Sequence, residues 1–151
     1  MRVLPFAVVI ASLGVIAARG ATPPAALHVS ARTRDRTTWD SVYTPEQAVR
    51  GQGVYAATCA RCHQESLSGA DEAPALAGGT FLSKWSGLSV GELHDRVRIT
   101  MPPSDPGTYG RQQISDVLAY LLSVNGFPAG KAELPVAAAA LQEIRIEATR
   151  R

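Results

Sequence analysis

The feature that most constrains this chain is a pair of cysteines followed directly by a histidine, at Cys59, Cys62 and His63. Two thiols at this spacing can each form a thioether with one vinyl group of a single haem, and the next residue then lies beside the iron. The pentapeptide therefore predicts one covalently attached haem c, with the His63 imidazole as an axial ligand of the iron. Aromatic residues make up only 6% of the chain, so an apolar cofactor would also help to fill a modest core.

Three other uses of the cysteine pair compete with haem attachment. A thioredoxin-like redox pair has the same spacing but belongs to a βαβ setting, which this sequence does not predict. A structural zinc site needs four ligands, and outside the pentapeptide the chain offers only His28 and His94 as nitrogen ligands. A disulfide across so short a loop would leave His63 without a role. Covalent haem is the favoured interpretation because it uses all three residues.

A sixth ligand of the iron is predicted at Met101. Apart from Met1 it is the only methionine of the chain, and it lies 38 residues after His63. Pro102 and Pro103 follow it, so a helix should end there and a rigid turn begin. A lone methionine is often only a filler of the core, but methionine and histidine are a known pair of axial haem ligands, and the pair raises the reduction potential.

His94 is the competing candidate for the sixth ligand. It stands among the charged residues Glu92, Asp95 and Arg96. We therefore expect His94 on the solvent-facing side of its helix, and Met101 is the preferred ligand.

The first helix of the folded part is predicted to begin after Thr44. Thr44 suits the N-cap, Pro45 the first helical position, and Gln47 the third position of a capping box. The helix should run to about residue 57. Gly51 lies inside it, where glycine costs ~1 kcal/mol relative to alanine, so we expect another helix to approach closely at this point.

Three further helices follow, and no alternating strand pattern of any length is present. A short helix is expected around 80–85. Ser89 and Glu92 form a second capping box, and the helix that they start should stop before Met101. The last helix spans 112–124, where apolar residues recur at helical spacing. The chain is therefore predicted to be all-α.

The expected organisation is a signal peptide over 1–20, a flexible arm over 21–43, a domain over 44–130 and a tail over 131–151. The apolar run within the first segment has 16 residues, fewer than the ~20 that usually span a bilayer, and small residues follow it. We expect export to the bacterial periplasm or beyond, and membrane attachment only if this segment stays uncleaved. Trp39 is a candidate to dock back on the domain, and the tail could be either a helix or an extended clamp.

Charge gives no sign of a polyanionic partner. The signal segment holds Arg2 and Arg19 and no acidic residue, so its removal leaves 13 basic side chains of the original 15 against 13 acidic ones. The mature chain then has no net charge from these groups. Neither nucleic acid nor an anionic membrane is therefore predicted as a partner.

Over residues 44–130 the sequence resembles the class I cytochrome c family. The resemblance rests on the pentapeptide, on Met101 with the proline after it, and on Gly51 and Tyr55, which lie eight and four residues before Cys59. It implies a cytochrome c fold, with three to five helices around one covalently bound haem and with crossing N-terminal and C-terminal helices.

The same resemblance implies roles for further residues. Val117 and Tyr120 would meet the N-terminal helix at the crossing. Pro74 would accept a hydrogen bond from the His63 imidazole through its backbone carbonyl, which fixes the tautomer and the orientation of the ring. Trp85 would approach a haem propionate.

A narrower similarity concerns the run from Phe81 through Trp85 to Met101, and the end of the domain at 127–130. It looks like bacterial cytochrome c domains found with quinoprotein dehydrogenases. This implies an electron carrier rather than an enzyme, with a protein donor and a protein acceptor such as a quinoprotein dehydrogenase or a terminal oxidase. Outer-sphere electron transfer is expected because two strong axial ligands leave no open site for a substrate.

Two other functions stay open at this point, and no acid–base pair or nucleophile suggests a catalytic residue. If Met101 does not ligate the iron, the haem could bind a gas or reduce peroxide. If Cys59 and Cys62 are free, the chain would be a thiol oxidoreductase without haem.

Overall fold

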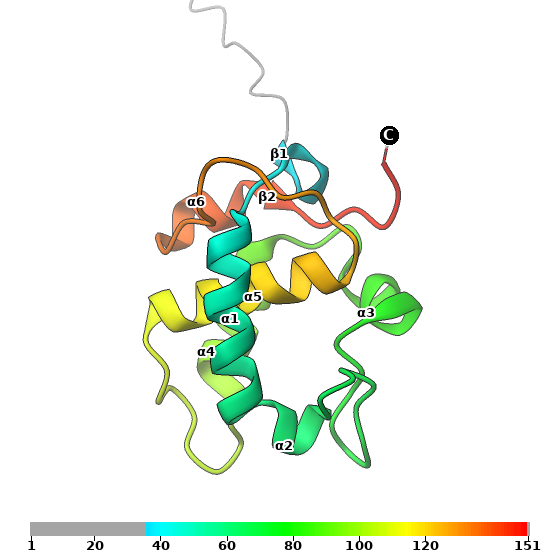
Figure 1. Ribbon diagram of the computed structural model, residues 1–151, viewed down its shortest axis with the longest axis vertical. Coiled ribbons are helices and arrows are strands. Elements are labelled where there is room, and N and C mark those ends of the chain that lie inside the picture. The colour runs from blue at the N-terminus through cyan, green and yellow to red at the C-terminus, as the bar shows by residue number, and fades with distance from the viewer. Residues whose placement is uncertain (1–35, 151) are drawn as a thin grey trace, which may run out of the picture. The chain divides into compact units, whose positions relative to one another are not determined.

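The computed structural model describes residues 36–150, which belong to one compact unit, Arg32–Arg151. The expected signal peptide and most of the expected arm lie outside the described residues. The elements (Figure 1) are β1 (Arg36–Thr37), the 3₁₀ turn η1 (Thr38–Asp40), α1 (Pro45–Thr58), α2 (Ala60–His63), α3 (Gly78–Trp85), α4 (Val90–Thr100), α5 (Arg111–Val124), α6 (Ala138–Gln142) and β2 (Ile144–Arg145).

The prediction of an all-α fold is confirmed, since the two strands have two residues each. Three to five helices were expected, and the described part forms six. The additional ones are α2, a single turn, and α6, which lies in the tail. In this part of the chain no helix has the length and apolar character needed to cross a membrane.

The start of α1 follows its predicted signals with one exception. The Thr44 side chain accepts a hydrogen bond from the Gln47 backbone N–H at 3.2 Å, and Pro45 occupies the first helical position. The Gln47 side chain does not complete a capping box. Its amide is fully buried and exchanges hydrogen bonds with the backbone of Leu134 in the tail, because the tail covers this end of the helix.

The capping box predicted for α4 is present. The Glu92 carboxylate accepts from the Ser89 backbone N–H at 2.7 Å, and the Ser89 hydroxyl accepts from the Glu92 backbone N–H at 3.0 Å. The helix ends at Thr100, so that Met101 is its C-cap, with its N–H donating to Val97 O at 2.9 Å.

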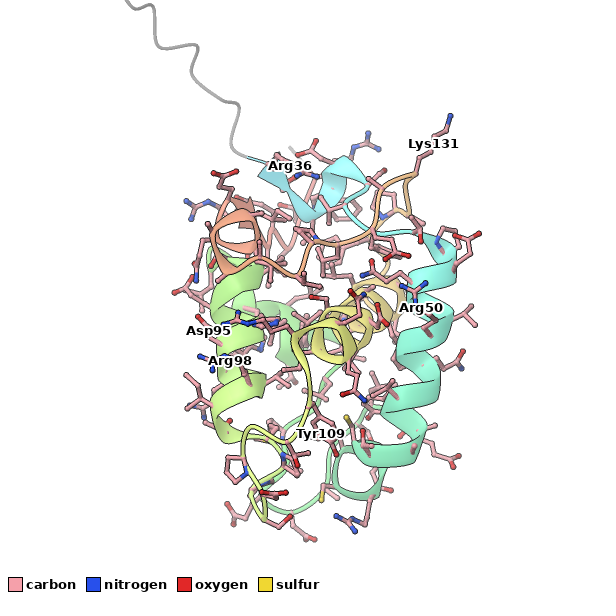
Figure 2. The ribbon with its side chains drawn as sticks, turned by 90° about the vertical axis from the view of Figure 1, so that its left-hand side faces the viewer. Arg36, Arg50, Asp95, Arg98, Tyr109 and Lys131 are labelled. Carbon is pink, nitrogen blue, oxygen red and sulfur yellow. The ribbon has the colours of Figure 1, made fainter. Side chains whose placement is uncertain are left out.

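Helices α1 and α5 cross as expected, and Figure 1 shows α1 passing in front of α5. A Cβ added to Gly51 would collide with the backbone carbonyl of Asp116, so only glycine allows this approach. One turn further along α1, the Tyr55 ring lies 5.4 Å from the Tyr120 ring. On the outer side of the crossing, Arg50 reaches from α1 towards α5 (Figure 2) and holds the buried Asp116 carboxylate at 3.1 Å.

The chain before α1 differs from the expected flexible arm from residue 36 onward. β1 pairs with β2 in parallel, so the start of the described chain and its tail form one small sheet. Trp39 docks on the domain as suggested, because its indole N–H donates to Glu147 O at 2.9 Å and its ring packs edge-on against Phe127 at 5.0 Å.

The tail contains both a helix and an extended segment. Leu141 in α6 and Ile144 in β2 are fully buried, and so is Ile146. The tail therefore completes the hydrophobic core at the end of the molecule opposite α2 (Figure 1).

Candidate functional site

A cavity of about 360 Å³ lies between α1, α2, α3, α4 and α5. The six residues predicted for the site all line it, although they come from four separate segments of the chain. They are Cys59, Cys62, His63, Pro74, Trp85 and Met101. The rest of the wall is mainly apolar, with contributions from Leu76, Leu93, Val97, Val117 and Leu121.

The pentapeptide forms one tight turn at the end of α1. Cys59 is both the C-cap of α1 and the N-cap of α2. Its carbonyl accepts hydrogen bonds from the backbone N–H groups of Cys62 at 3.1 Å and of His63 at 3.0 Å. This turn brings two thiols and one imidazole to the same cavity. Cys62 is exposed, and Cys59 is half-buried.

The His63 ring is buried and held in one orientation. Its Nδ1 lies 2.8 Å from Pro74 O. A carbonyl oxygen can only accept a hydrogen bond, so Nδ1 carries a proton, and in the neutral ring the lone pair is then on Nε2. Nε2 is the nitrogen left free to ligate a metal from the cavity wall.

The loop after His63 is shaped so that Pro74 reaches the imidazole. Gly69 adopts φ +73°, and a Cβ there would collide with the backbone of Ala73 and Pro74. The Gly69 N–H donates to His63 O at 3.1 Å, which closes the loop on the histidine. The Tyr55 hydroxyl fixes the start of the loop by donating to Gln64 O at 2.7 Å.

Asn125, just after α5, fixes the other end of this loop. Its side-chain NH₂ donates to Leu76 O at 3.0 Å, and its Oδ1 accepts from the Gly78 N–H at 2.9 Å. The sequence alone assigns Asn125 no part in the site. Its role as a tie depends on a partner 49 residues away, and no local pattern indicates that partner.

Met101 lines the cavity from the junction between α4 and the following loop, together with Pro102 and Pro103. Tyr109, at the end of the same loop, also lines the cavity, and Figure 2 shows it between the loop and α1. The Tyr109 ring was not singled out from the sequence, because it lies in a stretch of turn residues.

Charged side chains stand at the cavity rim. Lys84 and Arg96 are cationic, as is Arg61 between the cysteines, whereas Glu72 is anionic. Trp85 is nearly buried, and the Lys84 ammonium lies 5.9 Å from its ring centre.

The environment of Cys59 does not favour a reactive thiolate. Burial raises the pKa of the Cys59 thiol above its ordinary value, while the hydroxyl of Thr58, 3.3 Å from the sulfur, lowers it to a lesser extent. Thiols used for disulfide exchange ordinarily have lowered pKa values. The site therefore suits a cysteine that is bonded to a cofactor better than one that attacks disulfides.

The expectation that His94 faces solvent is wrong. Its side chain is fully buried in the contact between α4 and the start of α5, and it does not line the cavity. The charged neighbours in sequence suggested a polar face, but one turn of helix separates His94 from Val90 and the apolar stripe that packs inward.

The donor set fits a covalently bound haem. Two thiols are spaced for two vinyl groups, an imidazole offers Nε2, and the thioether of Met101 lines the same cavity. An apolar cavity suits the haem macrocycle, and the cations at its rim suit the two haem propionates. Between residues 36 and 150, no three His, Cys, Asp or Glu side chains gather as they would around a zinc ion.

Comparison with known proteins gives one family match. The family model described as cytochrome c matches residues 48–125. No curated protein matches the chain. Among solved structures, it is similar to a chain of the sulfane dehydrogenase SoxCD from Paracoccus pantotrophus, with 21% sequence identity and a TM-score of 0.46. That match covers 71% of this chain and 61% of the other, so it spans less than two thirds of the SoxCD chain.

Proposed function

Because this chain belongs to the cytochrome c family, we propose that it is an exported carrier of single electrons with one haem, ligated by His63 and Met101. The family makes it an electron-carrying haem protein. The observation that supports the finer proposal most strongly is the hydrogen bond from His63 Nδ1 to Pro74 O at 2.8 Å. This hydrogen bond leaves Nε2 available as a ligand, and His63 lines the same cavity as Cys59, Cys62 and Met101.

The haem supplies an iron that accepts and returns one electron. The residues of the chain determine how easily it does so. Pro74 would strengthen His63 as a ligand, because its carbonyl accepts a hydrogen bond from the His63 Nδ1–H. The apolar wall and the thioether of Met101 favour the state with less charge, so the reduction potential should be high for a haem.

Electrons would enter and leave where the cofactor is nearest to solvent. Cys62 is exposed, whereas His63 is only 8% exposed. The edge of the haem that is joined to Cys62 is therefore the proposed site of contact with redox partners. Such contacts are small and brief in electron transfer, which agrees with a carrier that must exchange donor for acceptor.

Export and partners are supported by sequence alone. The apolar segment within residues 1–20 has the character of a secretory signal. We propose a periplasmic or external location, with a quinoprotein dehydrogenase as a candidate donor and a terminal oxidase as a candidate acceptor.

The proposal is tested with the full chain made in a host that attaches haem c. The absorption spectrum of the reduced pyridine complex in alkaline solution shows whether both vinyl groups are consumed, and intact mass gives the number of haems per chain. One haem with both thioethers is expected. A double variant, Cys59→Ala with Cys62→Ala, should release any haem into acidic solvent. A protein without haem would return the cysteines to thiol chemistry and contradict the proposal.

The ligand Met101 is tested by the weak far-red band that marks a bond between methionine sulfur and ferric iron. Met101→Ala should abolish this band and allow carbon monoxide to bind the ferrous protein, while the haem stays attached. Val97→Ala is the matched control, because it also shortens an apolar side chain of the same cavity wall but removes no sulfur. If the band is absent before any substitution, the sensor or peroxidase function gains support.

A further inference from the structure

His94 is a buried titratable side chain that the proposed function does not use. Its side chain is fully buried, and neither Nδ1 nor Nε2 makes a well-formed hydrogen bond in the described part of the chain, although the Arg111 backbone and the Asp95 carboxylate lie near enough to act on the ring. The nearest carboxylate, that of Asp95, lies 3.8 Å from Nδ1, which is too long for a hydrogen bond. Buried polar groups are nearly always paired, so an imidazole without a well-formed hydrogen bond at this place calls for an explanation.

The position of His94 connects it to Met101. His94 lies in α4, and the residue of the next element that acts on it is Arg111, the first residue of α5. The loop that carries Met101 spans 101–110, and it leaves α4 and enters α5. His94 thus lies in the contact that joins the two ends of this loop.

The loop depends on this contact because it has few ties elsewhere. Its hydrogen bonds in the described structure are local ones. The Asp105 N–H donates to Pro102 O, the Thr108 hydroxyl to the Asp105 carboxylate, and the Gly110 N–H to the Gln113 side chain. None of them joins the loop to α1, α2 or α3. Its position is therefore set where α4 meets α5 and by side chains that line the cavity, such as Tyr109.

Burial and the neighbouring groups act in opposite directions on the protonation of His94. Burial has the largest effect and lowers the pKa of His94 below its ordinary value. The Arg111 guanidinium lowers it too, whereas the Arg111 backbone and the Asp95 carboxylate raise it. Asp95 also lies 3.5 Å from Arg98 Nε, one turn further along α4 (Figure 2), so its charge is shared. α6, which also packs on α4, has no charged residue.

We infer that neutral His94 is a positioning residue for Met101, and that a proton on His94 loosens the contact between α4 and α5 and releases the methionine loop from the haem. This rests on the proposed function, in which Met101 ligates the iron. An imidazolium buried without a full partner is costly, so the α4–α5 contact must open to let water reach it. The haem itself stays, since Cys59 and Cys62 hold it covalently.

The test follows the far-red band of the ferric holoprotein from about pH 8 down to about pH 4, across the ordinary pKa of histidine. The band should fade reversibly in acid while the haem stays attached. In His94→Gln, which does not titrate, the midpoint should move at least about one pH unit lower. His28→Gln is the control, because His28 is the remaining histidine that is not a proposed ligand, and it should leave the midpoint unchanged.

The outcomes separate this inference from the proposed function. If the band is missing at pH 8 in every form, the methionine ligand is wrong. If the band is present but wild type and His94→Gln lose it at the same pH, the role of His94 is wrong. If His94→Gln does not fold, proton NMR of the wild type decides. The His94 ring signals and the Met101 methyl signal should then change with the same midpoint, and separate midpoints would overturn the inference.

Discussion

The side-chain amide of Gln47 and the backbone of Leu134 exchange two hydrogen bonds, one with Nε2 donating to Leu134 O at 3.0 Å and one with Oε1 accepting from Leu134 N at 2.6 Å. An amide side chain thus pairs with the backbone as a neighbouring strand would. Because both groups are buried, the tail has a fixed register on α1.

Replacement of Gln47 by leucine should be costly. The variant leaves the N–H and C=O of Leu134 buried without partners, and an unsatisfied buried group costs ~1–3 kcal/mol. We expect Gln47→Leu to lower the free energy of unfolding by about 2 kcal/mol or more, measured by denaturant titration of the holoprotein. Gln52→Leu makes the same change at an exposed position of α1 and should have an effect within about 0.5 kcal/mol. Equal losses would contradict the role of the pair.

Gly51 and Gly53 allow a comparison within one helix. Gly53→Ala should raise stability by roughly 0.5–1 kcal/mol, because alanine favours helix and nothing lies within 4 Å of the added Cβ. Gly51→Ala should lower stability despite the same gain, since its Cβ would meet the Asp116 backbone. Thermal unfolding of both variants checks this. If Gly51→Ala proves neutral, α1 and α5 do not cross as closely as described.

Gly69→Ala should alter the haem through His63. The added Cβ would displace the backbone of Pro74 and weaken its hydrogen bond from Nδ1, so the imidazole becomes a poorer donor and the ferric state is less favoured. The reduction potential should therefore rise, as measured by spectroelectrochemistry. Gly78→Ala is the control. It has a similar φ of +74° but nothing within 4 Å of its Cβ, so it shares the backbone strain and should leave the potential unchanged.

Glu92 should contribute to acid sensitivity. Hydrogen bonds from the backbone and the hydroxyl of Ser89 lower the pKa of Glu92. A carboxylate with a lowered pKa stabilises the fold above its unfolded pKa, and this stability is lost as the pH falls through the folded pKa. We expect Glu92→Gln to flatten the loss of stability below about pH 5. Glu46→Gln, in the first turn of α1, should retain the slope of the wild type.

Much of the fold could be predicted because its signals are local. Ser89 and Glu92 mark the start of α4, and the prolines after Met101 mark its end. Gly51 correctly indicated that another helix, α5, crosses α1 at close range. These features depend on residues a few positions apart, so the sequence displays them directly.

The remaining features depend on contacts between distant parts of the chain. The two-residue strands β1 and β2 have no periodicity to detect, and Asn125 is tied to residues nearly 50 positions away. His94 was wrongly predicted to face solvent, because that prediction used its charged neighbours in the sequence and not its position on the buried face of the helix. For the site, all six predicted residues reach one cavity, while their roles as haem ligands and contacts stay predictions.

The parallel pairing of β1 with β2 also determines how the molecule could be held. It brings the first and last parts of the described chain together at the end of the fold opposite α2, which carries Cys62 (Figure 1). A linker to an electrode, or a fused domain, would leave from this one place whether it was joined near residue 36 or near residue 150. Either attachment would turn the exposed cysteine edge outward, so tethering and electron exchange would occupy opposite poles of the protein.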